Sequence, residues 1–212
     1  MLQQLSSLSP QDRDNNLEDS ILHLEKALEP GRRYISKYCC EYPIQAVSHP
    51  IATNTCYEKS RLLKETHSND WEPQRIVKAM YLKVNYCDIF GFVFPELDQT
   101  LQLAVVQNIF SKLGLEPPYS KNDLHFGQDC IPAGMEMGTC TPFASDEEMK
   151  YLSGIIIHDM PSLDDQLVDI SIGGKGEESH RRSLHLPYQA IFDILQAEYA
   201  SKYCIRKVDF FK

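Results

Sequence analysis

The chain has 212 residues, a length that predicts one domain of ordinary to large size. Hydrophobic residues make up 42% of it and charged residues 24%, so it can bury a sizeable core, and disordered and low-complexity classes are excluded. No apolar run approaches the ~20 residues of a membrane-spanning helix, and residues 1–16 lack the apolar core of a signal peptide. We therefore expect a soluble, cytoplasmic protein with no membrane partner.

The seven cysteines show no paired spacing. Cys39 and Cys40 are adjacent, and the other five stand alone. This pattern predicts free thiols in a reducing compartment and argues against a disulfide framework or a zinc ribbon.

Charge is unevenly distributed along the chain. The formal net charge is −9, and residues 79–171 carry 14 acidic against 4 basic residues. This charge argues against a protein that binds nucleic acid without regard to sequence, because affinity for phosphate requires clustered lysine and arginine. Basic residues outside that segment form one group near each end: Arg32, Arg33 and Lys37, and Lys175, Arg181, Arg182, Lys202, Arg206 and Lys207. These groups either meet in a local positive patch or are scattered solvated charges, and counting leaves both open.

The N-terminal segment is expected to stand apart from the domain. Residues 1–16 are interpreted as a mobile leader, and residues 17–29 as a helix with one apolar face that stops at Pro30-Gly31. We therefore divide the chain into an N-terminal leader and helix, residues 1–30, and one domain, residues 31–212.

Short strands and a capped helix are expected next. Residues 34–42 and 45–47 have a strand-like composition interrupted by prolines. Thr55 and Glu58 have the spacing of a capping box, in which each side chain satisfies an exposed N–H group of the other residue. This motif predicts a helix to about residue 66.

The middle of the chain predicts two strands and a long helix. Residues 75–84 and 89–94 read as strands, the second ended by Pro95. Asp98 can cap a helix through Leu113, because apolar residues recur on one face and a glycine follows as a stop.

The last third adds strands at residues 154–159, 167–172 and 204–210 and a helix at residues 187–198. Strands and helices interleave without a regular βαβ repeat. The fold class expected is therefore α/β with a single mixed β-sheet and surrounding helices.

A loop rich in glycine lies between the long helix and the strand at residues 154–159. Gly134 and Gly138 stand four apart and are followed by Thr139, Thr141 and Pro142. Such a loop can present bare backbone N–H groups to an anion or a carbonyl oxygen. It can equally be an ordinary turn that needs glycine only for its dihedral angles.

Two further features have two interpretations each. Lys78 lies inside the expected strand 75–84 and either faces solvent, which is the default for lysine, or points into a cleft. The turn at Gly173-Gly174 follows a strand end, where binding loops tend to lie, but it can also be a flexible hairpin.

Metal and nucleophile motifs do not stand out. The seven histidines lack metal-ligand spacing, and neither a Gly-x-Ser-x-Gly elbow nor a cysteine-protease motif is present. We therefore expect no metal and no cofactor.

In this order and spacing, four segments resemble the YbaK-like prolyl-tRNA editing family, also called the aminoacyl-tRNA deacylase or synthetase-associated domain. They are residues 77–82 with Lys78, residues 138–143 with the pattern Gly-x-x-x-Pro, residues 154–159, and residues 170–175. The resemblance covers about residues 33–197 and implies a barrel-like mixed sheet. It also implies an enzyme that hydrolyses the ester of mischarged aminoacyl-tRNA, here tRNA for proline carrying alanine or cysteine.

The resemblance implies roles for particular residues. Lys78 and the loop Gly138, Thr139, Cys140, Thr141 and Pro142 would be catalytic, Ser171, Gly173 and Gly174 would bind the substrate, and Lys175, Arg181 and Arg182 would bind tRNA. Ester hydrolysis needs an oxyanion site, which backbone N–H groups of the loop can supply. Water, placed by backbone groups and by the terminal ribose hydroxyl, would be the nucleophile.

Two points stay open. The chain has Ser171-Ile172-Gly173-Gly174 where alanine-specific members show His-Pro, so the amino acid removed is undetermined. The acidic middle suggests that a partner, such as a fused or separate prolyl-tRNA synthetase, supplies affinity for the acceptor end. The alternative function is a non-catalytic tRNA-binding or assembly module of that synthetase or of a multi-synthetase complex, with residues 1–30 as a docking segment.

Overall fold

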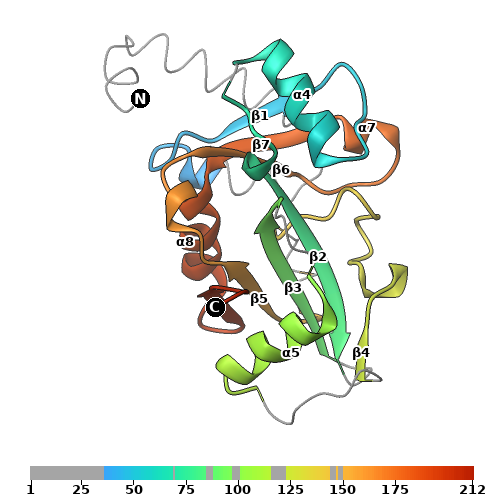
Figure 1. Ribbon diagram of the computed structural model, residues 1–212, viewed down its shortest axis with the longest axis vertical. Coiled ribbons are helices and arrows are strands. Elements are labelled where there is room, and N and C mark those ends of the chain that lie inside the picture. Colours follow the sequence, from blue (N-terminus) through green and yellow to red (C-terminus); the bar gives the residue numbers. More distant parts are fainter. Residues whose placement is uncertain are drawn as a thin grey trace.

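A mixed β-sheet runs through the protein and carries the helices on its faces (Figure 1). The computed structural model describes residues 36–68, 70–84, 88–96, 101–115, 123–143, 147 and 150–212. Over these residues the sheet has eight strands: β1 (Gln45–Ser48), β2 (Ile76–Val84), β3 (Asp88–Pro95), β4 (Leu124–His125), β5 (Leu152–His158), β6 (Leu167–Ser171), β7 (Arg182–Pro187) and β8 (Cys204–Val208).

The strand order is β1-β7-β6-β2-β3-β5-β8, and β4 pairs with the far end of β2. β2 is antiparallel to β3 and parallel to β6, whereas β3, β5 and β8 are parallel to one another. Among the described residues β1 and β8 are the two ends of this path, and no pairing joins them. The single mixed sheet is therefore confirmed, but its expected barrel-like closure is not.

Four α-helices lie entirely within the described residues: α4 (Cys56–Thr66), α5 (Leu103–Lys112), α7 (Glu177–His180) and α8 (Tyr188–Tyr199). Short 3-10 turns occur at η1 (Pro73–Arg75), η3 (Gln128–Cys130) and η4 (Pro161–Leu163). No helix in the described part of the chain combines the length and the apolar character that crossing a membrane requires.

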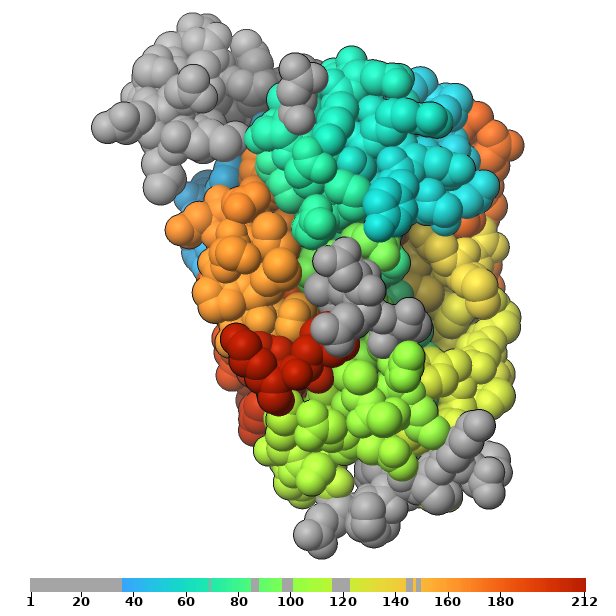
Figure 2. Space-filling model, in the orientation of Figure 1, coloured from blue at the N-terminus to red at the C-terminus, as the bar shows by residue number. Residues whose placement is uncertain are grey.

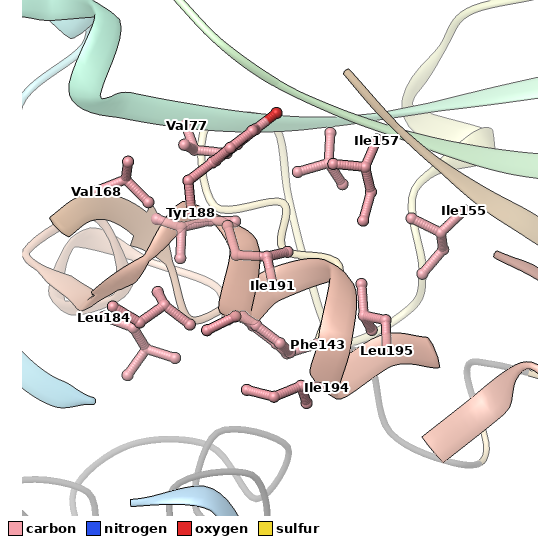
Figure 3. Packing of buried hydrophobic residues seen from close by; sticks show 14 of the residues in the cluster. Val77, Phe143, Ile155, Ile157, Val168, Leu184, Tyr188, Ile191, Ile194 and Leu195 are labelled. Atoms are coloured by element: carbon pink, nitrogen blue, oxygen red, sulfur yellow. The ribbon is translucent and has the colours of Figure 1, made fainter. Parts of the chain in front are cut away.

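The core has two halves, one on each face of the sheet. In β5 the side chains of Ile155 and Ile157 join the cluster that packs on α8, whereas Ile156 joins the cluster under α5. Figure 3 shows the first cluster around α8, with Ile191, Ile194 and Leu195 of the helix among its members. Because both faces are buried, the strand reads as an unbroken apolar run instead of an alternation.

A smaller cluster fixes α4 to the end of the sheet. Leu63 of α4, Trp71 and Ile76 at the start of β2 are buried against one another. On the neighbouring position of β2, Val77 belongs to the core under α8. The start of β2 thus lies between α4 and the main core, which places the residues that follow it beside α4.

Most expected elements are confirmed, with differences at their ends. The α4 cap is present, since the Thr55 hydroxyl accepts the Glu58 N–H at 3.1 Å, but the Glu58 carboxylate accepts from Asn54 instead of Thr55. The strand expected over residues 34–42 is wrong, because residues 36–38 are helical. β4, α7 and β7 were not expected.

Some expectations concern residues outside the described ranges. These are the leader and helix of residues 1–30 and the Asp98 cap. The helix expected from Asp98 begins, in its described part, as α5 at Leu103, with Gln102 at the N-cap position. Its expected glycine stop is confirmed at Gly114, which has a φ of 67°.

Candidate functional site

A cavity of about 730 Å³ opens where α4, β2, β6, α7 and the glycine loop meet. In the view of Figure 2, residues 123–143, in yellow, lie below the cyan and teal residues around α4, and both segments contribute to the cavity lining. The cavity is within the size range of small-molecule sites. Residues expected at the site that line it are Lys78, Gly138, Cys140, Ser171 and Arg182.

The glycine loop and the Gly173-Gly174 turn are bonded to each other. The Thr139 hydroxyl donates to the Gly174 carbonyl at 2.5 Å, and the Ser171 hydroxyl donates to the Thr139 carbonyl at 2.8 Å. Gly173 and Gly174 have φ values of 84° and 103°, which side chains rarely tolerate. The two segments singled out in the sequence therefore form one rigid wall.

Not every residue of the expected loop faces the cavity. Thr139 and Thr141 are fully buried, and the Thr141 carbonyl accepts the Tyr81 hydroxyl at 2.5 Å. Pro142 is buried as well. These three residues, with Gly173 and Gly174, support the wall and do not line the cavity.

Two residues of the loop that line the cavity have unused backbone donors. Gly138 and Cys140 are lining residues, and their N–H groups have no acceptor among the described residues. The N–H of Thr139 between them is occupied by the Glu136 carbonyl at 3.0 Å. Unused N–H groups in a cavity can hold an anion or a carbonyl oxygen.

Gly138 lies at a position of this wall where no other residue fits without strain. Its φ is 92°, and a Cβ atom there would lie 2.8 Å from Cε1 of His180 on α7. His180 in turn contacts Glu136 at 3.1 Å, and the Glu136 carboxylate accepts the Gly176 N–H at 2.7 Å. The glycine thus allows α7 to close against the loop.

Lys78 lines the cavity, so of the two positions that the sequence left open it takes the one at the cleft. Its ammonium forms an ion pair with Glu96, which also accepts a hydrogen bond from the Cys56 thiol. Burial acts to raise the pKa of Glu96, but the hydrogen bonds from Cys56 and Lys78 outweigh it, so the pKa is lowered. The side chain of Lys78 remains 41% exposed, so it can contact a ligand at the cavity mouth.

The two cysteines of the cavity are poor nucleophiles. Burial raises the pKa of Cys56 to about 12 and that of Cys140 to about 11. The thiolate is the reactive form, so both thiols are inert at neutral pH. The cavity therefore favours chemistry with water as the nucleophile.

A buried polar network, absent from the sequence expectations, adjoins the cavity. Asp169 of β6 is 2% exposed, and its carboxylate contacts Lys59, His185, His49 and the Ser183 hydroxyl. Burial acts to raise the pKa of Asp169, but the Lys59 charge and hydrogen bonds from both histidines hold it well below its ordinary value. The one sequence signal for this network was Asp169 itself, a carboxylate inside the apolar run of β6.

The expected tRNA-binding residues are divided. Arg182 lines the cavity mouth, whereas Arg181 and Lys175 do not. Arg181 pairs with Glu177 at 2.5 Å, and Arg182 with Glu178 at 3.6 Å, both on α7. Two other basic residues of the N-terminal and C-terminal groups are paired as well: Lys37 with Glu198, and Lys207 with Asp164 at 2.6 Å. Arg32 and Arg33 lie outside the described residues.

One cluster in the described part of the chain could hold a metal ion. It consists of His125, Asp129 and Cys130, whose ligand atoms lie within 4.8 Å of one another. None of the three lines the cavity. It therefore belongs to a different part of the molecule.

Comparison with known proteins identifies shared folds. No family model matches the chain, and no curated protein matches it in sequence. Among solved structures, the hypothetical protein APE2540 is 16% identical, with a TM-score of 0.56 over 85% of this chain and 98% of that one. A candidate trans-editing enzyme for prolyl-tRNA synthetase is 17% identical, with a TM-score of 0.50 over 89% of this chain and 93% of that one. These likenesses show that the chain has the fold of those two proteins.

Proposed function

We propose that the protein hydrolyses the ester bond of mischarged aminoacyl-tRNA. The observation that carries this proposal is that Lys78, Ser171 and two loop residues with unused N–H groups, Gly138 and Cys140, line one cavity. The resemblance to YbaK-like editing domains and the fold shared with a candidate trans-editing enzyme for prolyl-tRNA synthetase support it. The proposed substrate is tRNA for proline carrying a wrong amino acid.

The loop N–H groups suit the charge that develops in this reaction. A water oxygen attacks the ester carbonyl carbon, and the carbonyl electron pair moves onto the oxygen, where the Gly138 and Cys140 N–H groups stabilise it. Collapse of the intermediate restores the carbonyl and expels the ribose oxygen, which takes a proton from the attacking water. The products are the free amino acid and tRNA with its terminal hydroxyl.

Lys78 would orient the end of the tRNA. Its ammonium lies on β2 beside the cavity mouth, where it can contact a phosphate or carbonyl oxygen of the terminal nucleotide. Glu96 keeps the ammonium in place and balances its charge without covering it. The role is electrostatic positioning, which is how lysine generally acts toward phosphate.

The test is deacylation by the full-length protein. We expect it to accelerate loss of the ester from at least one of alanyl-, cysteinyl- and seryl-tRNA for proline, with correctly charged prolyl-tRNA as the control. No acceleration of any of these would overturn the enzyme proposal. If the protein then still binds tRNA, the non-catalytic module becomes the better explanation.

A further inference from the structure

The Lys59–Asp169 pair is part of the cavity wall, and nothing in the proposed hydrolysis uses it. Both residues line the cavity. The Lys59 side chain is 11% exposed and that of Asp169 is 3% exposed, whereas Lys78 is 41% exposed. Exposure therefore decreases from the mouth at Lys78 to a floor at the Lys59–Asp169 pair.

The floor has hydrogen-bonding capacity left over. Asp169 is the one charged partner of the Lys59 ammonium within 4 Å among the described residues, at 3.5 Å from Nζ to Oδ1. An ammonium has three donors, so at least two stay unused. Because Lys59 lines the cavity, an acceptor on a bound ligand can reach the donors that Asp169 does not use.

Asp169 offers the complementary function. Its Oδ2 atom is occupied by Ser183 and His185 and lies 3.4 Å from His49. Its Oδ1 atom faces Lys59, which is its one polar partner in the described part of the chain. Since each carboxylate oxygen has two lone pairs, Oδ1 can accept a further hydrogen bond.

We infer that the Lys59–Asp169 pair selects an aminoacyl group whose side chain carries a hydroxyl. A hydroxyl can accept from the Lys59 ammonium and donate to the Asp169 carboxylate at once, whereas a methyl group can do neither. A carboxylate side chain fits less well, because it would meet the charge of Asp169. This inference rests on the proposed function and names the substrate class, seryl or threonyl esters, of the same site.

The geometry of β6 places this pair within reach of a bound aminoacyl group. Asp169 and Ser171 lie two positions apart on one face of the strand, a separation of about 6.6 Å. Ser171 is bonded to the glycine loop through Thr139. A carbonyl held at that loop therefore directs the next few atoms of the amino acid toward Lys59, while the tRNA remains outside the mouth.

The network behind Asp169 holds the pair in position. Ser183 donates to Asp169 and lies 2.7 Å from Nε2 of His49, and the ring of His185 packs against Trp71 with a centroid distance of 4.5 Å and a tilt of 41°. A carboxylate fixed on one side by several donors cannot turn away from Lys59. The donor and acceptor of the floor are thus preorganised, which is the condition for discrimination between substrates.

The experiment compares two pairs of esters on the same tRNA, seryl with alanyl and threonyl with the isosteric valyl. We expect the wild-type kcat/KM to be at least about ten-fold higher for the hydroxyl-bearing member of each pair. Lys59→Met, which keeps the stem and removes the ammonium, should bring both ratios close to one. Lys59→Gln, which keeps N–H donors, should restore part of the preference.

The matched control is Lys64→Met on the same helix. Lys64 pairs with Glu72 at 2.7 Å outside the cavity, so its loss should leave both ratios unchanged. Equal wild-type rates for serine and alanine, or an unchanged ratio in folded Lys59→Met, would overturn the inference and leave the proposed hydrolysis intact.

A binding measurement separates this inference from the proposed function. Non-hydrolysable amides of 3′-amino-adenosine with serine and with alanine are titrated into wild-type protein and followed by calorimetry. Tighter binding of the serine amide supports the selection even where no ester is hydrolysed, provided that it is lost in Lys59→Met, or reduced but not lost in Lys59→Gln if the methionine variant does not fold. Equal affinity for the two amides, or no binding of either, overturns it.

Discussion

The hydroxyl of Thr139 donates a 2.5 Å hydrogen bond to the carbonyl of Gly174, and so joins the glycine loop to the turn after β6. The same hydroxyl oxygen accepts the Glu136 N–H at 3.1 Å. One buried side chain thus connects two backbone segments and also closes a hydrogen bond within the loop, and the shape of the cavity wall depends on it.

Thr139→Val should therefore destabilise the protein. Valine has the shape of threonine but leaves the Gly174 carbonyl and the Glu136 N–H without this partner, a loss of about 1–3 kcal/mol in the free energy of unfolding. Thr139→Ser keeps the hydroxyl and should lose less. Urea unfolding of the three proteins measures the difference, and a valine variant as stable as wild type would show that the bond is unimportant.

Gly138→Val should abolish activity by two effects. A β-branched residue is strained at a φ of 92°. Its Cβ would also lie only 2.8 Å from Cε1 of His180, so the histidine would have to move. Gly114→Val is the control, because Gly114 also has a positive φ but has nothing within 4 Å of an added Cβ. Both variants should lose stability, about 1–2 kcal/mol for the left-handed conformation, but Gly138→Val alone should lose deacylation. Full activity in Gly138→Val would make the loop a mere connector.

Periodicity predicted most of the fold because most elements carry their own signal. The apolar run around Ile156 and the Thr55 cap are local patterns, and both identified their elements. β7 has no such signal: it starts at Arg182 in a polar stretch, and its position depends on pairing with β1 and β6. Sheet closure is likewise a tertiary property that local patterns do not determine, and the barrel-like expectation was not confirmed.

The candidate site was predictable only in part, for the same reason. Lys78 and the glycines stood out through motifs in consecutive residues, and the cavity brings Lys78, Gly138 and Ser171 together. The Lys59–Asp169 pair joins a helix to a distant strand, so neither residue has a partner nearby in the sequence. Such a pair becomes visible only when the chain is folded.

Lys78→Ala should leave the fold intact and lower deacylation more than ten-fold, which corresponds to more than about 1.4 kcal/mol of transition-state stabilisation. The lysine is half-exposed at the cavity mouth, so little packing is lost. The control is Lys83→Ala on the same strand, since Lys83 faces Asp129 at 3.8 Å and does not line the cavity. Wild-type turnover by a folded Lys78→Ala protein would remove Lys78 from the site.

Stability should fall as the pH drops below about 6.5. Burial lowers the pKa of His158 from its ordinary value of 6.5, and its Nδ1 atom accepts the Phe210 N–H at 3.2 Å, which requires the neutral ring. The unfolded chain therefore takes up the proton first. One such histidine removes at most about 1.4 kcal/mol per pH unit. Chemical unfolding at pH 7.5 and 5.5 tests this, and the pH dependence should be smaller in His158→Gln; an equal slope in both proteins would contradict it.

The last prediction concerns the interaction between an acidic protein and tRNA. Arg181 and Arg182 directly follow α7, and Arg182 lines the cavity, but both pair with glutamates of that helix. A phosphate that binds either arginine must displace those glutamates. We expect the double variant Arg181→Ala/Arg182→Ala to bind tRNA more weakly. The slope of the logarithm of the association constant against the logarithm of the salt concentration should become less steep by about one for each phosphate that an arginine no longer neutralises. Selectivity among mischarged tRNAs should not change, because the aminoacyl group binds deeper in the cavity.

Lys150→Ala, a change at an exposed lysine that does not line the cavity, is the control. Normal binding with an unaltered salt slope in the double variant would make these arginines ordinary surface charges and would direct the search to Lys175 or to a partner protein.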